Sequence, residues 1–296
     1  MMVLETHIVP LLSEEIRLQD YGTSIFSAIT TKSALKKTIK QGGIRIDGEI
    51  ATTGHWIKEG QTIELLDLEK PLQKIFKLPL TVIFEDDHLA IIKKPAGYPT
   101  SGNYFRTIQN ALPFNLKISK GADAMKIPRP VHRLDNPTSG LLIIAKTRSA
   151  QKHLHQQFEE QHISKTYVAL VVGTPKLEGE ITLPINDRAA NTYFETLKTV
   201  NSLRNETLSS LKLYPRTGRT HQLRIHLSAI GHPIVGDALY GKEGHTLKHK
   251  GLFLSAVGLA LKHPHTDQRL RFELPPPNKF TLLMEKEERR YKKFNP

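Results

Sequence analysis

A turn between a polar cluster and an apolar run, in residues 131–146, constrains the fold of this chain most strongly. The cluster His132-Arg133-Leu134-Asp135 is followed by Asn136-Pro137-Thr138-Ser139-Gly140, whose residue types favour a turn, and then by the apolar run Leu141 to Ala145. A short apolar run bounded by a turn is typical of a buried strand. The sequence therefore predicts an internal sheet with a carboxylate held at the mouth of one strand.

Arg133 and Asp135 form a possible ion pair beside this turn. In an extended segment, the spacing of two residues puts both side chains on the same face, where the cation favours the ionised carboxylate. By itself, such a pair is more typical of a structural ion pair that caps a turn than of catalysis.

Four segments of the chain decide between these interpretations, because they occur in the same order in one known family. The segment 132–142 reads H-R-L-D-N-P-T-S-G-L-L, and the other three are residues 87–97 (DHLAIIKKPAG), 165–171 (KTYVALV) and 217–227 (TGRTHQLRIHL). They resemble the RluA-type RNA pseudouridine synthases, whose H-R-L-D-x-x-T-S-G-L signature carries the catalytic aspartate. The resemblance extends from about Leu80 to the end of the chain. It departs from the family after Gly97. The family usually has an apolar stretch that contains a histidine there, and this chain has residues 98–102 (YPTSG) instead.

The resemblance implies isomerisation of uridine to pseudouridine in RNA, with Asp135 as the nucleophile. It also assigns Arg224 as the ion-pair partner of Asp135 and Tyr167 as the aromatic residue that packs on the target base. The reaction breaks the glycosidic bond, rotates the trapped uracil and joins carbon 5 to the sugar, so an oxygen nucleophile suffices and no cofactor is needed. The sequence leaves open whether Asp135 attacks the anomeric carbon or carbon 6, or assists formation of a glycal.

The target base lies inside stacked RNA, so the nucleotide must be flipped into a pocket at a cost of about a few kcal/mol. His132 and Arg133, beside the nucleophile, are candidates for contacting the flipped nucleotide or its vacated place. Arg219 and His221 are further candidates for RNA binding, although a turn before a helix is an adequate structural explanation for the 217–219 segment.

The charge of the chain agrees with an RNA partner. The net charge is +13 and the pI is about 9.7, and basic side chains gain affinity for polyanions through counterion release. The absence of cysteine excludes disulfides and thiolate metal sites. The sequence contains neither a signal-peptide pattern nor an apolar run of membrane-spanning length. We expect a cytoplasmic monomer without a membrane partner.

Residues 1–70 are expected to form a small separate module. Apolar residues recur at helical spacing over 16–25 and again at Leu35 and Ile39, and Gly42-Gly43 would end the second helix. Residues 44–50 alternate as a hairpin around Asp47-Gly48, and residues 61–65 alternate again. The G-G-I-R-I-D-G-E pattern resembles the small RNA-binding module of a ribosomal small-subunit protein, which is fused to many bacterial pseudouridine synthases.

Basic residues gather in one part of this module. Residues 1–70 contain 8 basic and 10 acidic residues, a net charge of −2, which leaves +15 for the rest of the chain. Five basic residues nevertheless occur without an intervening acid: Lys32, Lys36, Lys37, Lys40 and Arg45. They predict a strip that contacts phosphates, and the alternative is a solvated helix face.

The remainder is predicted to be a linker over 71–80 and a catalytic domain over 81–296. Strands are expected at 81–84, 89–93, 141–145, 165–172, 180–185, 194–200, 207–214, 252–261 and 269–274, and helices at 149–162, 220–230 and 279–293. Residues 100–130 show no clear period and are predicted to be a long loop that contains one helical turn. The whole is expected to be α+β, with a mixed, mostly antiparallel sheet in the large domain and a small N-terminal α/β domain.

Other functions were weighed against an RNA pseudouridine synthase that acts on large-subunit ribosomal RNA. Transfer RNA is the alternative substrate, and a non-catalytic RNA-binding or ribosome-assembly protein is the alternative class. Histidine pairs such as His245/His249 could suggest a metal, but no H-E-x-x-H arrangement accompanies them. A glycosidase-type pair of Asp135 with Asp237 leaves the basic charge unexplained.

Overall fold

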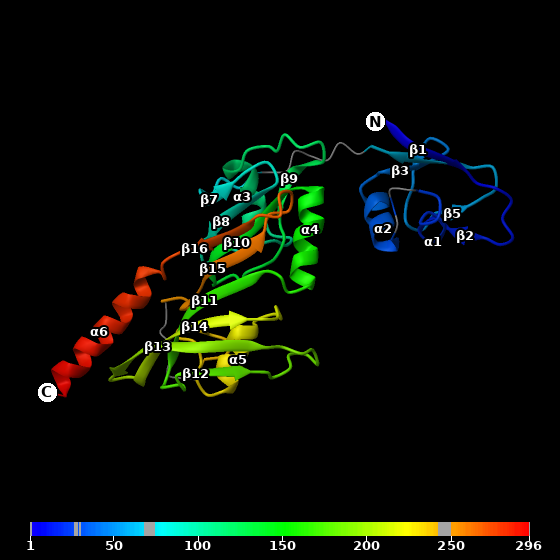
Figure 1. The fold of residues 1–296 in the computed structure, drawn as a ribbon. Coiled ribbons are helices and arrows are strands. Elements are labelled where there is room, and N and C mark those ends of the chain that lie inside the picture. The colour runs from blue at the N-terminus through cyan, green and yellow to red at the C-terminus, as the bar shows by residue number, and fades with distance from the viewer. Residues whose placement is uncertain (1, 27–28, 30, 68–74, 242–249, 296) are drawn as a thin grey trace. The chain divides into compact units, whose positions relative to one another are not determined.

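The computed structural model describes residues 2–26, 29, 31–67, 75–241 and 250–295, and the chain forms two compact units (Figure 1). The first unit is Met1–Gln73 and the second is Lys74–Pro296. Each unit has its own hydrophobic core, since one cluster of buried residues lies between Val9 and Leu65 and the others contain only residues after position 77.

The small unit contains a four-stranded antiparallel sheet in the order β1-β6-β3-β4. Its elements are β1 (Val3–Ile8), β2 (Ile16–Arg17), α1 (Leu18–Tyr21), α2 (Lys32–Lys40), β3 (Ile44–Ile46), β4 (Glu49–Ile50), β5 (Trp56–Ile57) and β6 (Thr62–Leu66). The predicted hairpin is confirmed, because Asp47 and Gly48 between β3 and β4 both have positive φ, at 47° and 89°. Leu35 and Ile39 of α2 are buried in the core of this unit.

Two expectations for the small unit are wrong. The helix expected over 16–25 is limited to α1, because Ile16 and Arg17 pair with β5 and the Leu18 N–H donates to the His55 carbonyl. Strand β1 was not foreseen at all. Its pairing with β6 is a long-range contact that outweighs the weak local signal of residues 3–8.

The large unit is built on a ten-stranded sheet in the order β12-β13-β14-β11-β15-β10-β8-β7, with β16 paired to β15 and β9 paired to β10. The strands are β7 (Thr81–Glu85), β8 (Leu89–Lys94), β9 (Ala124–Pro130), β10 (Ser139–Thr147), β11 (Ser164–Val172), β12 (Glu178–Ile181), β13 (Thr192–Ser202), β14 (Glu206–Pro215), β15 (Leu254–Lys262) and β16 (Arg269–Glu273). Among these strands only β10 and β15 pair in parallel. The prediction of a mixed, mostly antiparallel α+β fold is confirmed.

In the described part of this unit, four helices accompany the sheet: α3 (Ile108–Asn115), α4 (Arg148–Glu159), α5 (Gln222–Ala229) and α6 (Asn278–Phe294). Helix α4 packs against β10, α6 packs against β13, and Leu223 and Leu227 of α5 enter the core formed with β11 and β14 (Figure 1). Residues 100–130 are not a long loop, because they contain α3 and β9. Pro113 within α3, and Pro128 and Pro130 within β9, obscure both elements in the sequence.

Strand β10 is the buried strand that residues 141–145 predict. Leu141 and Ile143 belong to one hydrophobic cluster, while Leu142 and Ile144 belong to another. At its beginning, Gly140 has a φ of 122°, and a Cβ atom there would lie 2.0 Å from the Ala256 carbonyl oxygen. Only glycine therefore allows β10 to approach β15 at the point where the 132–139 turn meets the sheet.

Candidate active site

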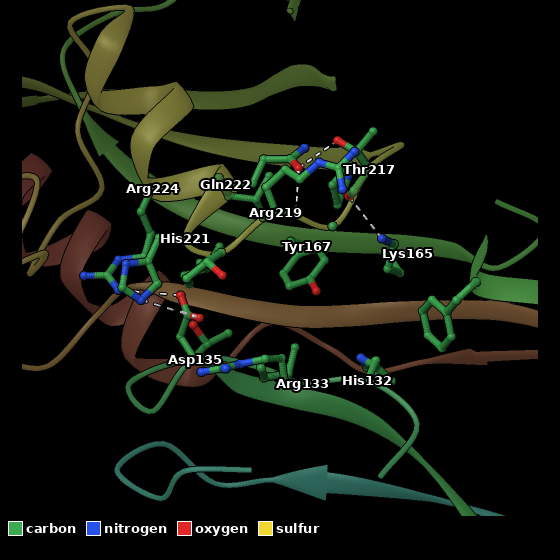
Figure 2. A pocket seen from close by; sticks show the side chains of 18 residues that line it. His132, Arg133, Asp135, Lys165, Tyr167, Thr217, Arg219, His221, Gln222 and Arg224 are labelled. Carbon is green, nitrogen blue, oxygen red and sulfur yellow. Dashed lines mark hydrogen bonds and ion pairs between the residues drawn. The ribbon is translucent and has the colours of Figure 1, made fainter. Parts of the chain in front are cut away.

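A cavity of about 270 Å³ opens in the large unit beside the turn that precedes β10 (Figure 2). Its walls come from residues 132–138, from β11 and α4, and from the segment that leads into α5. All seven candidate residues of the large domain line it: His132, Arg133, Asp135, Tyr167, Arg219, His221 and Arg224. The fold thus brings together side chains that are up to 92 positions apart in the sequence.

Lys94, at the end of β8, holds the turn that carries Asp135 in place. The Lys94 side chain is fully buried, and its Nζ donates to the carbonyl oxygens of Pro95, Asp135, Asn136 and Thr138 at 3.1, 3.1, 3.2 and 2.8 Å. Burial lowers the pKa of Lys94 to about 8, although the charge of Asp135 acts in the opposite direction. Sequence analysis missed this role of Lys94. The feature that could have indicated it is a lysine at the end of an apolar strand, directly before a proline.

The Asp135 carboxylate faces the side chains of Arg224 and His221 at one end of the cavity. Arg224 Nη1 lies 3.5 Å from Asp135 Oδ2, and His221 Nε2 lies 3.8 Å from Oδ1. Within the described residues these are its ion-pair partners, so the predicted pair with Arg133 does not form. The chain bends at residues 131–132 and turns at residues 136–137, on either side of this pair, and the Arg133 side chain is exposed.

Arg224 is itself fixed by a second carboxylate, Asp237. Its Nε donates to Asp237 Oδ2 and its Nη2 to Oδ1, both at 2.7 Å, and both side chains are buried. Burial alone would raise the pKa of Asp237, but hydrogen bonds from Arg224 and from the N–H groups of Leu239 and Tyr240 outweigh it and lower that pKa. Asp237 is thus an ionised structural partner, which argues against its use as the acid of a glycosidase pair.

Tyr167 projects from β11 into the middle of the cavity (Figure 2). Burial, followed by the charge of Asp135, raises the pKa of its hydroxyl, so the side chain is neutral. On the same end as Asp135, His221 adopts a left-handed backbone conformation with φ 56°, and its Nδ1 lies 3.0 Å from the Tyr240 hydroxyl. This geometry aims its other ring nitrogen at Asp135.

His132 and Arg219 each make an internal hydrogen bond besides lining the cavity. The Ile143 N–H donates to His132 Nε2 at 3.0 Å, and burial lowers the pKa of His132 to about 3, so the imidazole is neutral. Arg219 Nε donates to the Ala189 carbonyl at 3.0 Å. His132 therefore supports the middle of β10, and Nε2 has no remaining capacity for RNA.

Gln222, at the start of α5, was not foreseen. Its Oε1 accepts from Thr217 Oγ1 at 2.7 Å and from the Arg219 N–H at 3.0 Å. Its Nε2 donates to the Asn191 carbonyl at 2.9 Å and to Thr192 Oγ1 at 3.0 Å. The buried amide fixes the 217–219 turn against β13, and no sequence signal beyond its place in T-H-Q-L-R pointed to it.

The four lysines of the predicted basic strip lie on α2 in the small unit, and Arg45 lies on β3. Lys32, Lys36, Lys37 and Lys40, with Ser33 and Gln41, line one shallow hollow. Two members of the strip are paired with acids that are distant in the sequence: Lys32 with Asp20 at 3.0 Å and Arg45 with Glu64 at 2.7 Å. The strip is less free of acids than the sequence indicated, because folding brings these carboxylates to it.

The structure gives no support to a metal site. No group of three or more potential ligands is found among the described residues, and His245 and His249 lie outside them. Another histidine, His263, pairs with a single carboxylate: its Nε2 lies 2.7 Å from Asp86 Oδ2. In the described part of the chain, no helix is both long and apolar enough to span a membrane.

Comparison with known proteins gives consistent results. Residues 88–229 match a family model described as RNA pseudouridylate synthase. A ribosomal large subunit pseudouridine synthase D of Nitrosomonas europaea is 33% identical over 284 residues, covering 86% of this chain and 80% of that protein. The protein of the same name from Zymomonas mobilis is 36% identical over 231 residues, covering 70% and 72%. The solved structure of human RNA pseudouridylate synthase domain containing 1 has a similar fold, with a TM-score of 0.56 at 24% identity, covering 71% of this chain and 87% of that one.

Proposed function

The chain belongs to the RluA-type RNA pseudouridine synthases, and from this premise we propose that it isomerises specific uridines of large-subunit ribosomal RNA. The observation that carries the proposal is the Asp135 carboxylate, held in a cavity of about 270 Å³ beside Arg224. The assignment to ribosomal RNA is supported by the names of the relatives from Nitrosomonas europaea and Zymomonas mobilis.

In the proposed mechanism Asp135 is the nucleophile and Arg224 keeps it ionised. A guanidinium is charged at any relevant pH and favours the carboxylate form of its neighbour. The separation of 3.5 Å leaves Asp135 only loosely paired, whereas the bond of Arg224 to Asp237 is short and bidentate. Arg224 can thus stabilise the charge of Asp135 without competing strongly for the oxygen that must attack.

The flipped uracil is proposed to pack on Tyr167. The neutral phenol offers an aromatic face next to the nucleophile and is a candidate for receiving or relaying the proton from carbon 5. The reaction has three possible routes, in which Asp135 attacks the anomeric carbon, attacks carbon 6 or removes the 2′ proton to give a glycal. The same carboxylate serves all three, and no cofactor is required.

RNA binding is proposed to involve both units. Arg133 is exposed at the cavity mouth, and Arg219 and His221 line it, so these three are proposed to contact the target nucleotide and its phosphates. His132 is proposed to act through the position of β10. In the small unit, the hollow lined by the lysines of α2 is proposed to bind phosphates of the same RNA.

The test is to map pseudouridines in all RNA of cells with and without the gene. We expect one or a few sites in large-subunit ribosomal RNA to disappear and to return when the gene is restored. Loss of sites in transfer RNA alone would overturn the ribosomal assignment. We also propose that the protein acts as a monomer in the cytoplasm, where ribosomal RNA is found.

A further inference from the structure

Lys165 is a cation of the cavity that the mechanism above does not use. It lies on β11, two residues before Tyr167, and both side chains line the same cavity. Its Nζ donates to the Thr217 carbonyl at 3.2 Å, and no carboxylate among the described residues forms an ion pair with it. Burial lowers the pKa of Lys165, so the protein holds this ammonium at a cost in desolvation.

The charged groups are distributed along the cavity in a definite order (Figure 2). Asp135, Arg224 and His221 are gathered at one end, Tyr167 lies between, and Lys165 and His132 lie on the far side of Tyr167. Because His132 is neutral, Lys165 is the cation of that far region. A base that stacks on Tyr167 with its glycosidic bond toward Asp135 extends its opposite edge toward Lys165.

That opposite edge has a carbonyl oxygen both before and after the reaction. In uridine, N1 is bonded to the ribose, and C4 with O4 is across the ring from N1. In pseudouridine, C5 is bonded to the ribose, and C2 with O2 is across the ring from C5. Rotation of the uracil therefore replaces one carbonyl by the other at the same place, and a lysine can donate to either.

We propose that the Lys165 ammonium binds the uracil oxygen that points away from the ribose and stabilises the negative charge that the ring acquires during isomerisation. The inference rests on the proposed binding of uridine in this cavity. It adds Lys165 to the catalytic residues, and it explains why the site would accept uridine and not cytidine.

The electron balance puts charge on this oxygen in every route. When the C1′–N1 bond breaks, its electron pair stays with the uracil and is delocalised over N1, O2 and O4, whether an Asp135 oxygen bonds to C1′ or removes the 2′ proton. When an Asp135 oxygen bonds to C6 instead, the C5–C6 π pair moves through C4 onto O4. The C5–C1′ bond then forms from the ring's electron pair, and as it forms the Asp135 oxygen leaves C1′ in the first route or C2′ regains its proton in the glycal route. C5 then loses its proton and N1 gains one. In the C6 route, the electron pair left by the C5 proton restores the C5–C6 double bond and expels the Asp135 oxygen from C6. A fixed cation at a developing oxyanion is an effective form of catalysis in a buried site.

The same contact would select uridine over cytidine. Cytosine has an amino group in place of O4, and an amino group opposite an ammonium leaves two donors facing each other. A site built to donate to an oxygen rejects a base that lacks it, because its own polar group is then left unpaired.

The test compares Lys165→Gln and Lys165→Met with the wild-type enzyme on total RNA from cells that lack the gene. Glutamine keeps a donor for the Thr217 carbonyl but removes the charge, whereas methionine removes both. We expect both variants to lower the single-turnover rate by about 10²–10³-fold at saturating RNA, with a Kd for RNA within about threefold of wild type. Lys286→Gln, on the exposed face of α6, is the matched control and should leave rate and Kd unchanged.

Two outcomes would overturn the proposal. A glutamine variant near the wild-type rate beside a slow methionine variant would reduce Lys165 to a structural donor for the 217–219 turn. Wild-type rates in both variants would show that the charge is not used. Total RNA contains the substrate whether the target uridine lies in ribosomal or in transfer RNA. If the ribosomal assignment is wrong, the modified site maps to another RNA, but the rates of the Lys165 variants can still be compared with the wild-type rate.

A second measurement tests the atom contacted. RNA whose target base is pyrimidin-2-one lacks O4, and it should bind the wild-type enzyme about tenfold more weakly than the uridine RNA. Lys165→Gln should bind the two RNAs within about threefold of each other. If the wild-type enzyme and Lys165→Gln prefer the uridine RNA by the same factor, a residue other than Lys165 contacts O4.

Discussion

At the scale of single residues, the proposed reaction depends first on the charge of Asp135. Asp135→Asn conserves the shape of the side chain and removes its nucleophilic oxygen anion, so we expect single-turnover formation of pseudouridine to fall by at least about 10⁴-fold. RNA affinity should change little, because the change lies within an already formed cavity. The measurements are pseudouridine formation in purified RNA and filter binding.

The matched control for this prediction is Asp267→Asn. Asp267 is exposed, lies in the turn between β15 and β16 and has a positive φ of 56°, which asparagine also adopts readily. Its replacement should leave activity unchanged. A single-turnover rate of Asp135→Asn within about 10²-fold of wild type would contradict the assignment of the nucleophile.

Arg224 links catalysis to stability, because it contacts two carboxylates. Arg224→Met should slow turnover severely by removing the cation 3.5 Å from Asp135. It should also lower the free energy of unfolding by about 3–5 kcal/mol, because Asp237 would be buried without its partner. Single-turnover kinetics and urea unfolding measure the two effects.

Asp237→Asn separates these two effects of Arg224. It breaks the bidentate contact but keeps the cation beside Asp135, so it should cost stability while retaining more activity than Arg224→Met. If Arg224→Met turns over at nearly the wild-type rate, the role of stabilising Asp135 passes to another group, such as Arg219 or His221, whose Nε2 lies 3.8 Å from Asp135 Oδ1.

Lys94 gives a prediction about pH. Its pKa is lowered from 10.5 to about 8, so between these values the folded protein binds fewer protons than the unfolded chain. The contribution of Lys94 to the free energy of unfolding should therefore rise with pH across this window. In urea unfolding at pH about 7.5 and about 9.5, wild type should gain stability relative to Lys94→Met. Parallel stabilities of the two proteins at both pH values would show that the pKa of Lys94 is not lowered.

At the scale of elements, α2 is where the small unit is proposed to contact RNA. Each lysine that releases counterions from phosphates contributes about 0.7–0.9 to the slope of log affinity against log salt. Replacing Lys36, Lys37 and Lys40 together by glutamine should therefore reduce the slope by about 2–3, without changing turnover at saturating RNA. Lys32→Gln alone should have a smaller effect, since Lys32 is already paired with Asp20.

Lys58→Gln is the control for the α2 variant, because Lys58 is exposed in the same unit but does not line the hollow. It should leave the salt slope unchanged. If the triple variant also leaves the slope unchanged, the lysines of α2 are a solvated helix face and the +15 charge of the remainder carries the RNA.

At the scale of the whole molecule, catalysis and the small unit should be separable. Every residue that lines the cavity belongs to the large unit, and the two units have separate cores. A chain of residues 75–296 should therefore unfold cooperatively and keep single-turnover rates within about threefold at saturating RNA, with RNA affinity at least about tenfold weaker. Loss of cooperative unfolding in this truncated chain would show that the large unit depends on the first 74 residues.

The sequence by itself determined the large sheet and the location of the chemistry, because both rest on local patterns. The apolar run after Gly140 predicted the buried strand β10, and its hydrophobic side chains do enter clusters on both faces of the sheet. The turn residues before it and the ordered motifs led to Asp135, Tyr167 and Arg224, which line one cavity. Local patterns failed where proline interrupted an element, as in α3 and β9, and where a strand such as β1 depends on a distant partner.

Only the tertiary structure decided which charged side chains form ion pairs and which side chains hold the site in place by hydrogen bonds. An ion pair depends on distances across the fold, so the spacing of Arg133 and Asp135 suggested a pair that the turn does not form, while Asp237 joined Arg224 from a separate loop. Burial decided the role of Lys94, since a lysine in a sequence gives no sign that its ammonium will be enclosed. Desolvation and charge pairing are properties of the assembled core, and they set the electrostatics of this site.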